Sequence, residues 1–220
     1  MNVEQVLFEV SDALRWPVLV LALLALGVAI VEAGALMMEL RRRRGRSLWQ
    51  LDHAIAECQG RLAAGMPAEA LAALLPIARN PAMEEVLGEL IAHQGGPAAE
   101  ARVAKQLAEY DYRSLRRLER TRILVRMGPA LGLMGTLIPL SPALAGLADG
   151  DVATLTENLR VAFGVTVIGL LVGAIAFAIS LVRDRLYAQD YSDVEYVAAR
   201  LTPAASNGTG SPHSHWAVAP

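Results

Sequence analysis

Residues 127–147 read MGPALGLMGTLIPLSPALAGL and contain no ionisable side chain. A second stretch, residues 161–182, reads VAFGVTVIGLLVGAIAFAISLV and is equally free of charge. Crossing the hydrocarbon core of a bilayer takes about 20 apolar residues in a helix. A helix also satisfies its own backbone hydrogen bonds, which lipid cannot do. Both stretches are therefore predicted to be transmembrane helices.

Residues 17–38 form a further apolar stretch, interrupted only by Glu32. A cleaved signal peptide is the alternative interpretation, but the acidic residues Glu4, Glu9 and Asp12 precede this stretch, which is the wrong charge for a signal sequence. Of the 220 residues 54% are hydrophobic and 19% are charged, against about 25% charged in soluble domains. We therefore expect an all-α integral membrane protein with three transmembrane helices.

Basic residues gather at one end of these spans. Arginines at 41, 42, 43, 44 and 46 follow the first span, and arginines at 113, 116, 117, 120, 122 and 126 precede the second. Lys and Arg near span ends mark the cytoplasmic side of a membrane. The N-terminus is thus predicted outside, and residues 39–126 and the C-terminus in the cytoplasm.

Prolines and glycines indicate helical organisation between and after the spans. Pro67 and Pro81 each open a predicted helix, and Gly95-Gly96 closes the second. From residue 98 one helix is expected to run into the second span, and the third span is expected to continue to Pro203. The predicted segments are an outer N-terminal segment (1–16), transmembrane helix 1 (17–38), a cytoplasmic helical domain (39–126), transmembrane helix 2 (127–147), a short outer loop (148–160), transmembrane helix 3 (161–182), a cytoplasmic helix extension (183–202) and a disordered C-terminal tail (203–220).

Small residues recur at three- and four-residue spacing in the last two spans. Gly128 and Gly132 lie on one face of the second span, and Gly169 and Gly173 lie on one face of the third. Such faces let two helices approach closely within a membrane. These four glycines are predicted to be helix-packing positions.

Pro139 interrupts the hydrogen bonding of the second span. Because proline has no N–H, it cannot donate to the carbonyl of Gly135. That carbonyl is expected beside the Thr136 hydroxyl, where two oxygens can stabilise a cation, water or a protonated carboxyl. A purely structural kink is the alternative interpretation of this proline.

Residues 128–137 (GPALGLMGTL) and 158–170 (NLRVAFGVTVIGL) resemble the MotA/TolQ/ExbB proton-channel family, whose ExbB/TolQ-like branch has three spans. The resemblance implies a homo-oligomer, a pentameric ring, around a dimer of a single-span partner similar to ExbD, TolR or MotB. That partner supplies an Asp within the membrane. The implied location is the bacterial or archaeal cytoplasmic (inner) membrane, and the implied role is an ion-conducting rotary motor or energy-transducing complex.

By this resemblance Thr136 and Thr166 match the pore-facing threonines of the family, and Gly135 and Pro139 join them in the predicted ion pathway. Sodium-using relatives carry additional hydroxyls near the third-span threonine. Their absence before Thr166 favours protons over sodium as the conducted ion. No metal or other cofactor is expected.

Glu32 is the one acidic residue within a predicted span, and it is a possible secondary polar site. Acids inside a membrane are functional candidates by default. One interpretation gives Glu32 a role in the ion path or in partner contact. The other is a paired or protonated carboxyl near the cytoplasmic interface.

Other classes of function find little support in the sequence. It contains no nucleophile–base pair, phosphate-binding glycine loop or metal-ligand spacing, so an enzyme is not expected. A net charge of −2 argues against nucleic-acid binding. The alternative function is a non-conducting membrane scaffold that docks proteins through its cytoplasmic helices, although a scaffold has no use for two hydroxyls in the spans.

Overall fold

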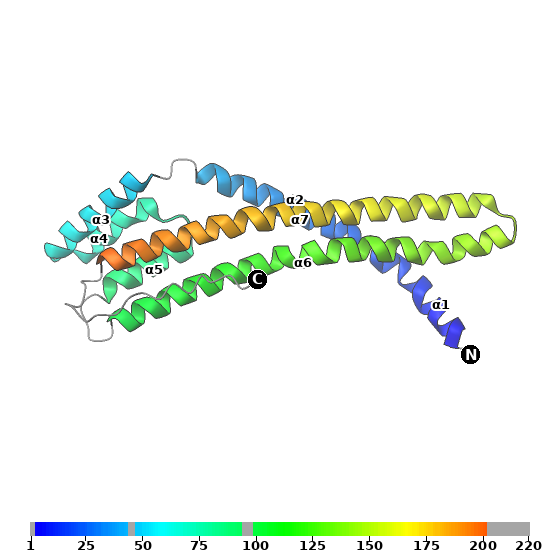
Figure 1. The fold of residues 1–220 in the computed structure, drawn as a ribbon, viewed down its shortest axis with the longest axis horizontal. Coiled ribbons are helices and arrows are strands. Elements are labelled where there is room, and N and C mark those ends of the chain that lie inside the picture. Colours follow the sequence, from blue (N-terminus) through cyan, green and yellow to red (C-terminus); the bar gives the residue numbers. More distant parts are fainter. Residues whose placement is uncertain (1–2, 44–46, 94–98, 202–220) are drawn as a thin grey trace, which may run out of the picture. The chain divides into compact units, whose positions relative to one another are not determined.

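The computed structural model describes residues 3–43, 47–93 and 99–201 (Figure 1). Within these ranges the only regular elements are helices, which confirms the predicted all-α fold class. They are α1 (Val3–Ala13), α2 (Arg15–Arg42), α3 (Leu48–Ala63), α4 (Pro67–Leu74), the 3-10 helix η1 (Leu75–Ile77), α5 (Pro81–Ala92), α6 (Ala99–Ala148) and α7 (Val152–Leu201).

Three helices are long and apolar enough to cross a membrane, which confirms the three predicted spans. The first candidate runs over Glu9–Arg42 and includes α2, and the others are α6 and α7. Helices α6 and α7 have 50 residues each, or about 75 Å at 1.5 Å per residue. Since the apolar core of a bilayer is only about 30 Å thick, both helices extend well beyond it.

The helix ends follow the local sequence signals. Pro67 and Pro81 occupy the first turns of α4 and α5, and the Asn80 side chain caps α5 by accepting a hydrogen bond from the Met83 N–H (2.9 Å). Helix α7 ends at Leu201, two residues before Pro203. The predicted tail 203–220 and the Gly95-Gly96 helix end lie outside the described residues.

The connection between α6 and α7 is shorter than the predicted outer loop of residues 148–160. Only residues 149–151 separate the two helices. Gly150 adopts a left-handed conformation (φ +80°), and Asp151 accepts hydrogen bonds from the backbone N–H groups of Ala153 and Thr154 at 3.1 Å each. The Thr154 hydroxyl also donates to Asp151, and these bonds lower the pKa of its carboxyl. Charged residues such as Glu157 are thus part of α7, because this cap starts the helix before the uncharged stretch begins.

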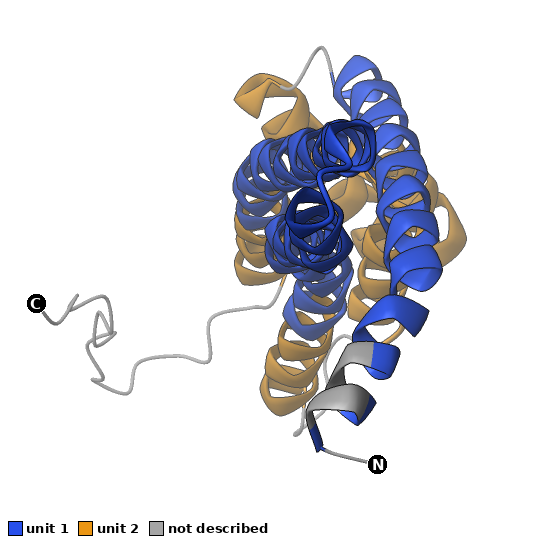
Figure 2. Ribbon diagram, turned by 90° about the vertical axis from the view of Figure 1, so that its right-hand side faces the viewer, with its two compact units in different colours: residues 1–46, 111–189 blue, residues 47–110, 190–220 orange. Residues whose placement is uncertain are grey.

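The chain forms two compact units, coloured separately in Figure 2. The first, residues 1–46 and 111–189, contains α1, α2 and the apolar parts of α6 and α7. The second, residues 47–110 and 190–220, contains α3 to α5 and the remaining turns of α6 and α7. Its core includes Ile55, Leu74, Met83, Leu87 and Val194, all fully buried. The candidate ion-pathway residues all belong to the first unit.

Candidate functional site

Helices α6 and α7 approach so closely within the first unit that their backbones touch. A Cβ atom on Gly169 would lie 2.5 Å from the Gly128 carbonyl oxygen and 2.7 Å from the Gly132 Cα. A Cβ on Gly128 would lie 2.7 Å from the Gly169 oxygen, and one on Gly173 would lie 2.9 Å from Pro129 Cδ. These distances leave no room for a side chain. The four glycines assigned to helix packing therefore lie in one continuous contact.

Thr166 lies within this contact, half-buried on α7. Its Oγ1 is 3.0 Å from the Ala162 carbonyl of its own helix and 3.3 Å from the Gly132 carbonyl of α6. A threonine hydroxyl has one proton to donate but two lone pairs that can accept. The hydroxyl can therefore alternate between two carbonyls and still accept a hydrogen bond from a third group.

Thr136 lies one turn beyond Gly132 on α6, about 6 Å along the helix axis. Its hydroxyl donates to the Leu133 carbonyl at 2.7 Å, and the side chain is partly exposed. The structure thus places the Thr136 and Thr166 hydroxyls on adjacent turns of the α6–α7 pair. Each is held by a backbone carbonyl and keeps its acceptor capacity.

Pro139 is buried within α6, and the helix continues through it and through Pro129 and Pro142. The Gly135 carbonyl therefore receives no backbone hydrogen bond from position 139. Gly135 itself packs against the Val165 side chain of α7, which a Cβ on Gly135 would overlap. Gly135 thus packs closely against α7, and its carbonyl lacks the usual helical hydrogen bond; this carbonyl is called the released Gly135 carbonyl below.

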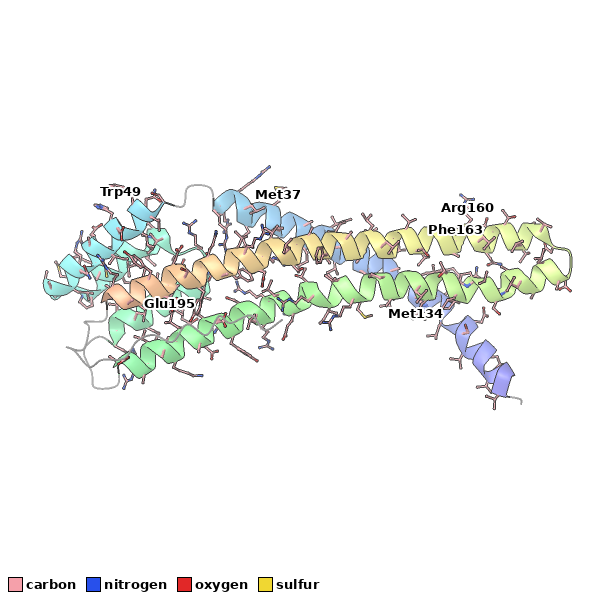
Figure 3. The ribbon with its side chains drawn as sticks, viewed as in Figure 1. Met37, Trp49, Met134, Arg160, Phe163 and Glu195 are labelled. Atoms are coloured by element: carbon pink, nitrogen blue, oxygen red, sulfur yellow. The ribbon has the colours of Figure 1, made fainter. Side chains whose placement is uncertain are left out.

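The faces of α6 and α7 away from this contact carry large apolar side chains. Phe163 is 66% exposed and projects from the ribbon, as does Met134 (Figure 3). Leu133, Leu137 and Leu170 are similarly exposed. Such surfaces are stable only against lipid or against other apolar helices. They therefore belong to a multi-pass membrane protein.

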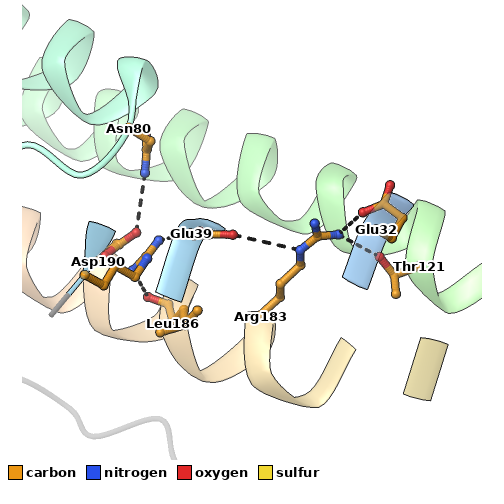
Figure 4. A network of polar contacts seen from close by, with 8 residues as sticks. Glu32, Glu39, Asn80, Thr121, Arg183, Leu186 and Asp190 are labelled. Atoms are coloured by element: carbon orange, nitrogen blue, oxygen red, sulfur yellow. Dashed lines mark hydrogen bonds and ion pairs between the residues drawn. The ribbon is translucent and has the colours of Figure 1, made fainter. Parts of the chain in front are cut away.

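Glu32 belongs to a second polar group in the first unit, here called the Arg183 cluster: Glu32, Glu39, Arg43, Thr121 and Arg183. Figure 4 labels Glu32, Glu39, Thr121 and Arg183 of this cluster. The Arg183 Nη1 donates to Glu32 Oε2 at 2.5 Å and to the Thr121 hydroxyl at 3.1 Å. Arg183 Nε lies 4.0 Å from Glu39 Oε2. The Arg183 side chain is only 10% exposed, so its guanidinium depends on these partners for compensation of its charge.

The remaining members of the cluster extend it toward the Arg-rich end of the spans. Arg43 pairs with Glu39 at 2.7 Å and donates to the Leu186 carbonyl at 3.4 Å. The pKa of the nearby Tyr187 hydroxyl is raised, mainly because the group is buried and secondly because of the negative charge of Glu39. With two arginines and two glutamates the cluster is charge-balanced and ties α2 to α6 and α7. This geometry favours the paired-carboxyl interpretation of Glu32 over a role in the ion path.

Sequence reasoning did not assign a role to Thr121 or Arg183. The available signal was that Glu32 is the one acid in the first span and Arg183 the first charge after the third. Opposite charges at the same end of two spans can pair across them, but their separation of 151 residues gives no local pattern to indicate it.

A polar contact also fixes the opposite end of α2. Arg15 Nη2 donates to Asn158 Oδ1 at 3.1 Å, and the Asn158 Nδ2 donates to the Thr154 carbonyl at 3.0 Å. Between this contact and the Arg183 cluster, Val18 of α2 packs with Leu131 and Ile138 of α6. The first span is thus attached to the α6–α7 pair at both ends.

More than half of the chain matches the model of one known protein family. Residues 78–194 match the model described as the MotA/TolQ/ExbB proton channel family. The matched region contains both candidate threonines, Gly135, the four helix-packing glycines and Arg183, but not α2. No curated protein matches the sequence. Among the described residues no group of three His, Cys, Asp or Glu side chains could hold a metal ion.

Proposed function

Because the chain belongs to the MotA/TolQ/ExbB proton channel family, we propose that it is the ring-forming subunit of a complex that uses the proton-motive force. Members of this family work in energy-transducing complexes with single-span partner proteins. In our proposal five copies surround a partner dimer similar to ExbD, TolR or MotB, as in the three-span ExbB/TolQ branch. The ring forms part of the ion path, and ion flow turns ring and partner relative to each other.

The observation that carries this proposal is the pair of hydroxyls on adjacent turns of α6 and α7. The uncharged stretches of these helices, residues 127–147 and 161–182, contain no acid of their own, so in our proposal the carboxylate comes from the partner. A charge at the bilayer centre costs about 2.5–3.5 kcal/mol on insertion scales. Thr136, Thr166 and the released Gly135 carbonyl offer polar contacts that lower this cost for the partner Asp. Protonation of this Asp from one side of the membrane and its deprotonation toward the other then move protons, rather than sodium ions, across the membrane.

The energetics are sufficient for such a step. Each elementary charge that moves down a potential of 100 mV releases about 2.3 kcal/mol. This exceeds thermal energy about fourfold and can bias a small rotation. With the arginine-flanked span ends in the cytoplasm, the α6–α7 connection lies outside and the second unit inside. By the family resemblance, we place the complex in the bacterial or archaeal cytoplasmic (inner) membrane.

Replacing Thr166 by valine tests the proposed pathway. We expect ion flux through the reconstituted complex of chain and partner to fall by at least about tenfold, because a hydrogen bond to a charged group is worth about 1.5–3 kcal/mol and each 1.4 kcal/mol is a factor of about ten. Thr136→Val is expected to act in the same direction. The measurement is proton uptake into liposomes under an imposed potential. Ser180→Ala is the matched control, since this hydroxyl donates to the Phe177 carbonyl in the same span. Unchanged flux in both threonine variants would remove them from the pathway.

Pro139→Ala tests the released carbonyl. Alanine supplies the missing N–H, so the Gly135 carbonyl becomes hydrogen-bonded and is less available to a partner carboxyl or water. We expect lower flux in the same liposome assay, with complex assembly unchanged. Pro142→Ala is the control, because it restores the equivalent bond to Ile138 instead. Equal flux in wild type and the Pro139 variant would show that the Gly135 carbonyl has no part in conduction.

The same liposome assay separates this proposal from the alternative, a non-conducting scaffold. Flux that requires both chains supports a shared ion path. A confirmed complex of chain and partner without flux under any imposed potential supports the scaffold.

A further inference from the structure

The first turn of α3 carries an apolar surface that the second unit does not cover. Leu48 is 68% exposed and Trp49 is 71% exposed, and Trp49 projects away from the ribbon (Figure 3). The Trp49 ring stacks on the His53 ring with centroids 5.2 Å apart and an interplanar angle of 4°. The opposite face of α3, with Ile55 and Cys58, is fully buried in the core. Folding of the unit therefore leaves the Trp49 surface (Leu48, Trp49 and His53) unused.

The position of this surface in the chain indicates what covers it. Trp49 follows Arg42, the last residue of α2, by seven residues. Seven residues span at most about 25 Å, so the Trp49 surface stays within reach of the membrane where α2 ends. Tryptophan is enriched at membrane–water interfaces, where its ring is apolar and its N–H remains hydrated.

The charges around the surface favour an anionic partner. The arginines at 41, 42, 43, 44 and 46 precede it in the sequence; Arg43 pairs with Glu39, whereas Arg41 and Arg42 are exposed. A basic run next to a span attracts anionic phospholipids. The acids on α3 are engaged within the unit: Asp52 accepts a hydrogen bond from the Tyr196 hydroxyl at 2.7 Å, and Glu57 pairs with Arg61 at 3.0 Å.

We propose that the Trp49 surface is a membrane anchor that binds anionic phospholipid. Leu48 and Trp49 enter the headgroup layer, and Arg41 and Arg42, which precede them in the chain by six to eight residues, bind lipid phosphates. The proposed anchor is thus the first turn of α3 together with the basic residues that precede it in the chain. This inference goes beyond the proposed function, because it requires neither the partner protein nor ion flow.

Tryptophan fluorescence of the full chain in liposomes tests the anchor. The substitutions Trp16→Phe and Trp216→Phe leave Trp49 as the one tryptophan. The liposomes contain phosphatidylcholine and phosphatidylglycerol, and either lipid carries brominated acyl chains, which quench nearby tryptophans. We expect brominated phosphatidylglycerol to quench Trp49 at least twofold more than brominated phosphatidylcholine. In a variant that also carries Arg41→Gln and Arg42→Gln this preference is lost. A chain with Trp16 alone is the control for membrane insertion.

Three results would overturn the proposal. The first is a Trp49 emission that neither brominated lipid quenches, while Trp16 is quenched. The second is equal quenching by both lipids, because the headgroup charge then plays no part. The third is a blue-shifted emission that depends on protein density instead of lipid, which would show that a second copy of the chain covers Trp49.

Discussion

Gly169→Ala is expected to destabilise the protein, whereas Gly164→Ala in the same helix leaves it folded and stable. A Cβ at position 169 would lie 2.5 Å from the Gly128 carbonyl oxygen and 2.7 Å from the Gly132 Cα, so two backbones must separate. At position 164 a Cβ meets nothing within 4 Å. Alanine is also the better helix former, by about 1 kcal/mol. Since both variants share that gain, the difference between them isolates the close contact.

The size of the effect follows from overpacking. Forcing extra atoms into a packed contact costs about 1–3 kcal/mol, and each kcal/mol shifts the Tm of a chain of this size by about 2–4 °C. Thermal unfolding in detergent should therefore show a Tm for Gly169→Ala several degrees below that of Gly164→Ala. The separation also moves Thr166 away from the Gly132 carbonyl, so we expect ion flux to fall as well. Equal Tm values would mean that the two helices do not touch at Gly169.

Arg183→Leu is expected to be the most destabilising change in the Arg183 cluster. It leaves Glu32 without its cationic partner and removes the hydrogen bond to the Thr121 hydroxyl. Removing one member of a buried ion pair costs about 3–5 kcal/mol. The cost here is below that range, because the Glu32 side chain is 25% exposed. The end of α2 that carries Glu32 is then expected to separate from α6 and α7.

A double-mutant cycle measures this coupling directly. The double variant Glu32→Gln with Arg183→Leu should be more stable than the sum of the single changes predicts, because no uncompensated charge remains. Arg160→Gln is the control, since Arg160 and Glu157 are both exposed and lie 3.9 Å apart. That change should cost less than about 1 kcal/mol. Strictly additive effects at Glu32 and Arg183 would contradict the pairing.

Much of the architecture is determined by the sequence alone. Apolar stretches of about 20 residues, two of them free of charge and one interrupted only by Glu32, give the spans, because lipid disfavours charge and requires a hydrogen-bonded backbone. Pro67 and Pro81 mark helix starts, since proline fits the first turn and not the interior. The two stretches around Thr136 and Thr166 resemble the MotA/TolQ/ExbB family, and the match of residues 78–194 to that family's model confirms the resemblance. All of these are local properties, so a linear pattern can carry them.

What only the tertiary structure decides is which residues meet. Gly164 and Gly169 are equally small and lie in the same span, yet only Gly169 touches another backbone. Helical spacing defines a face, but the rotation of that face toward α6 depends on the packing of both helices. Likewise, the apolar stretch of residues 17–38 places Glu32 in a span, but only the fold pairs it with Arg183. Contacts between segments depend on the relative geometry of whole helices, which no local pattern of residues specifies.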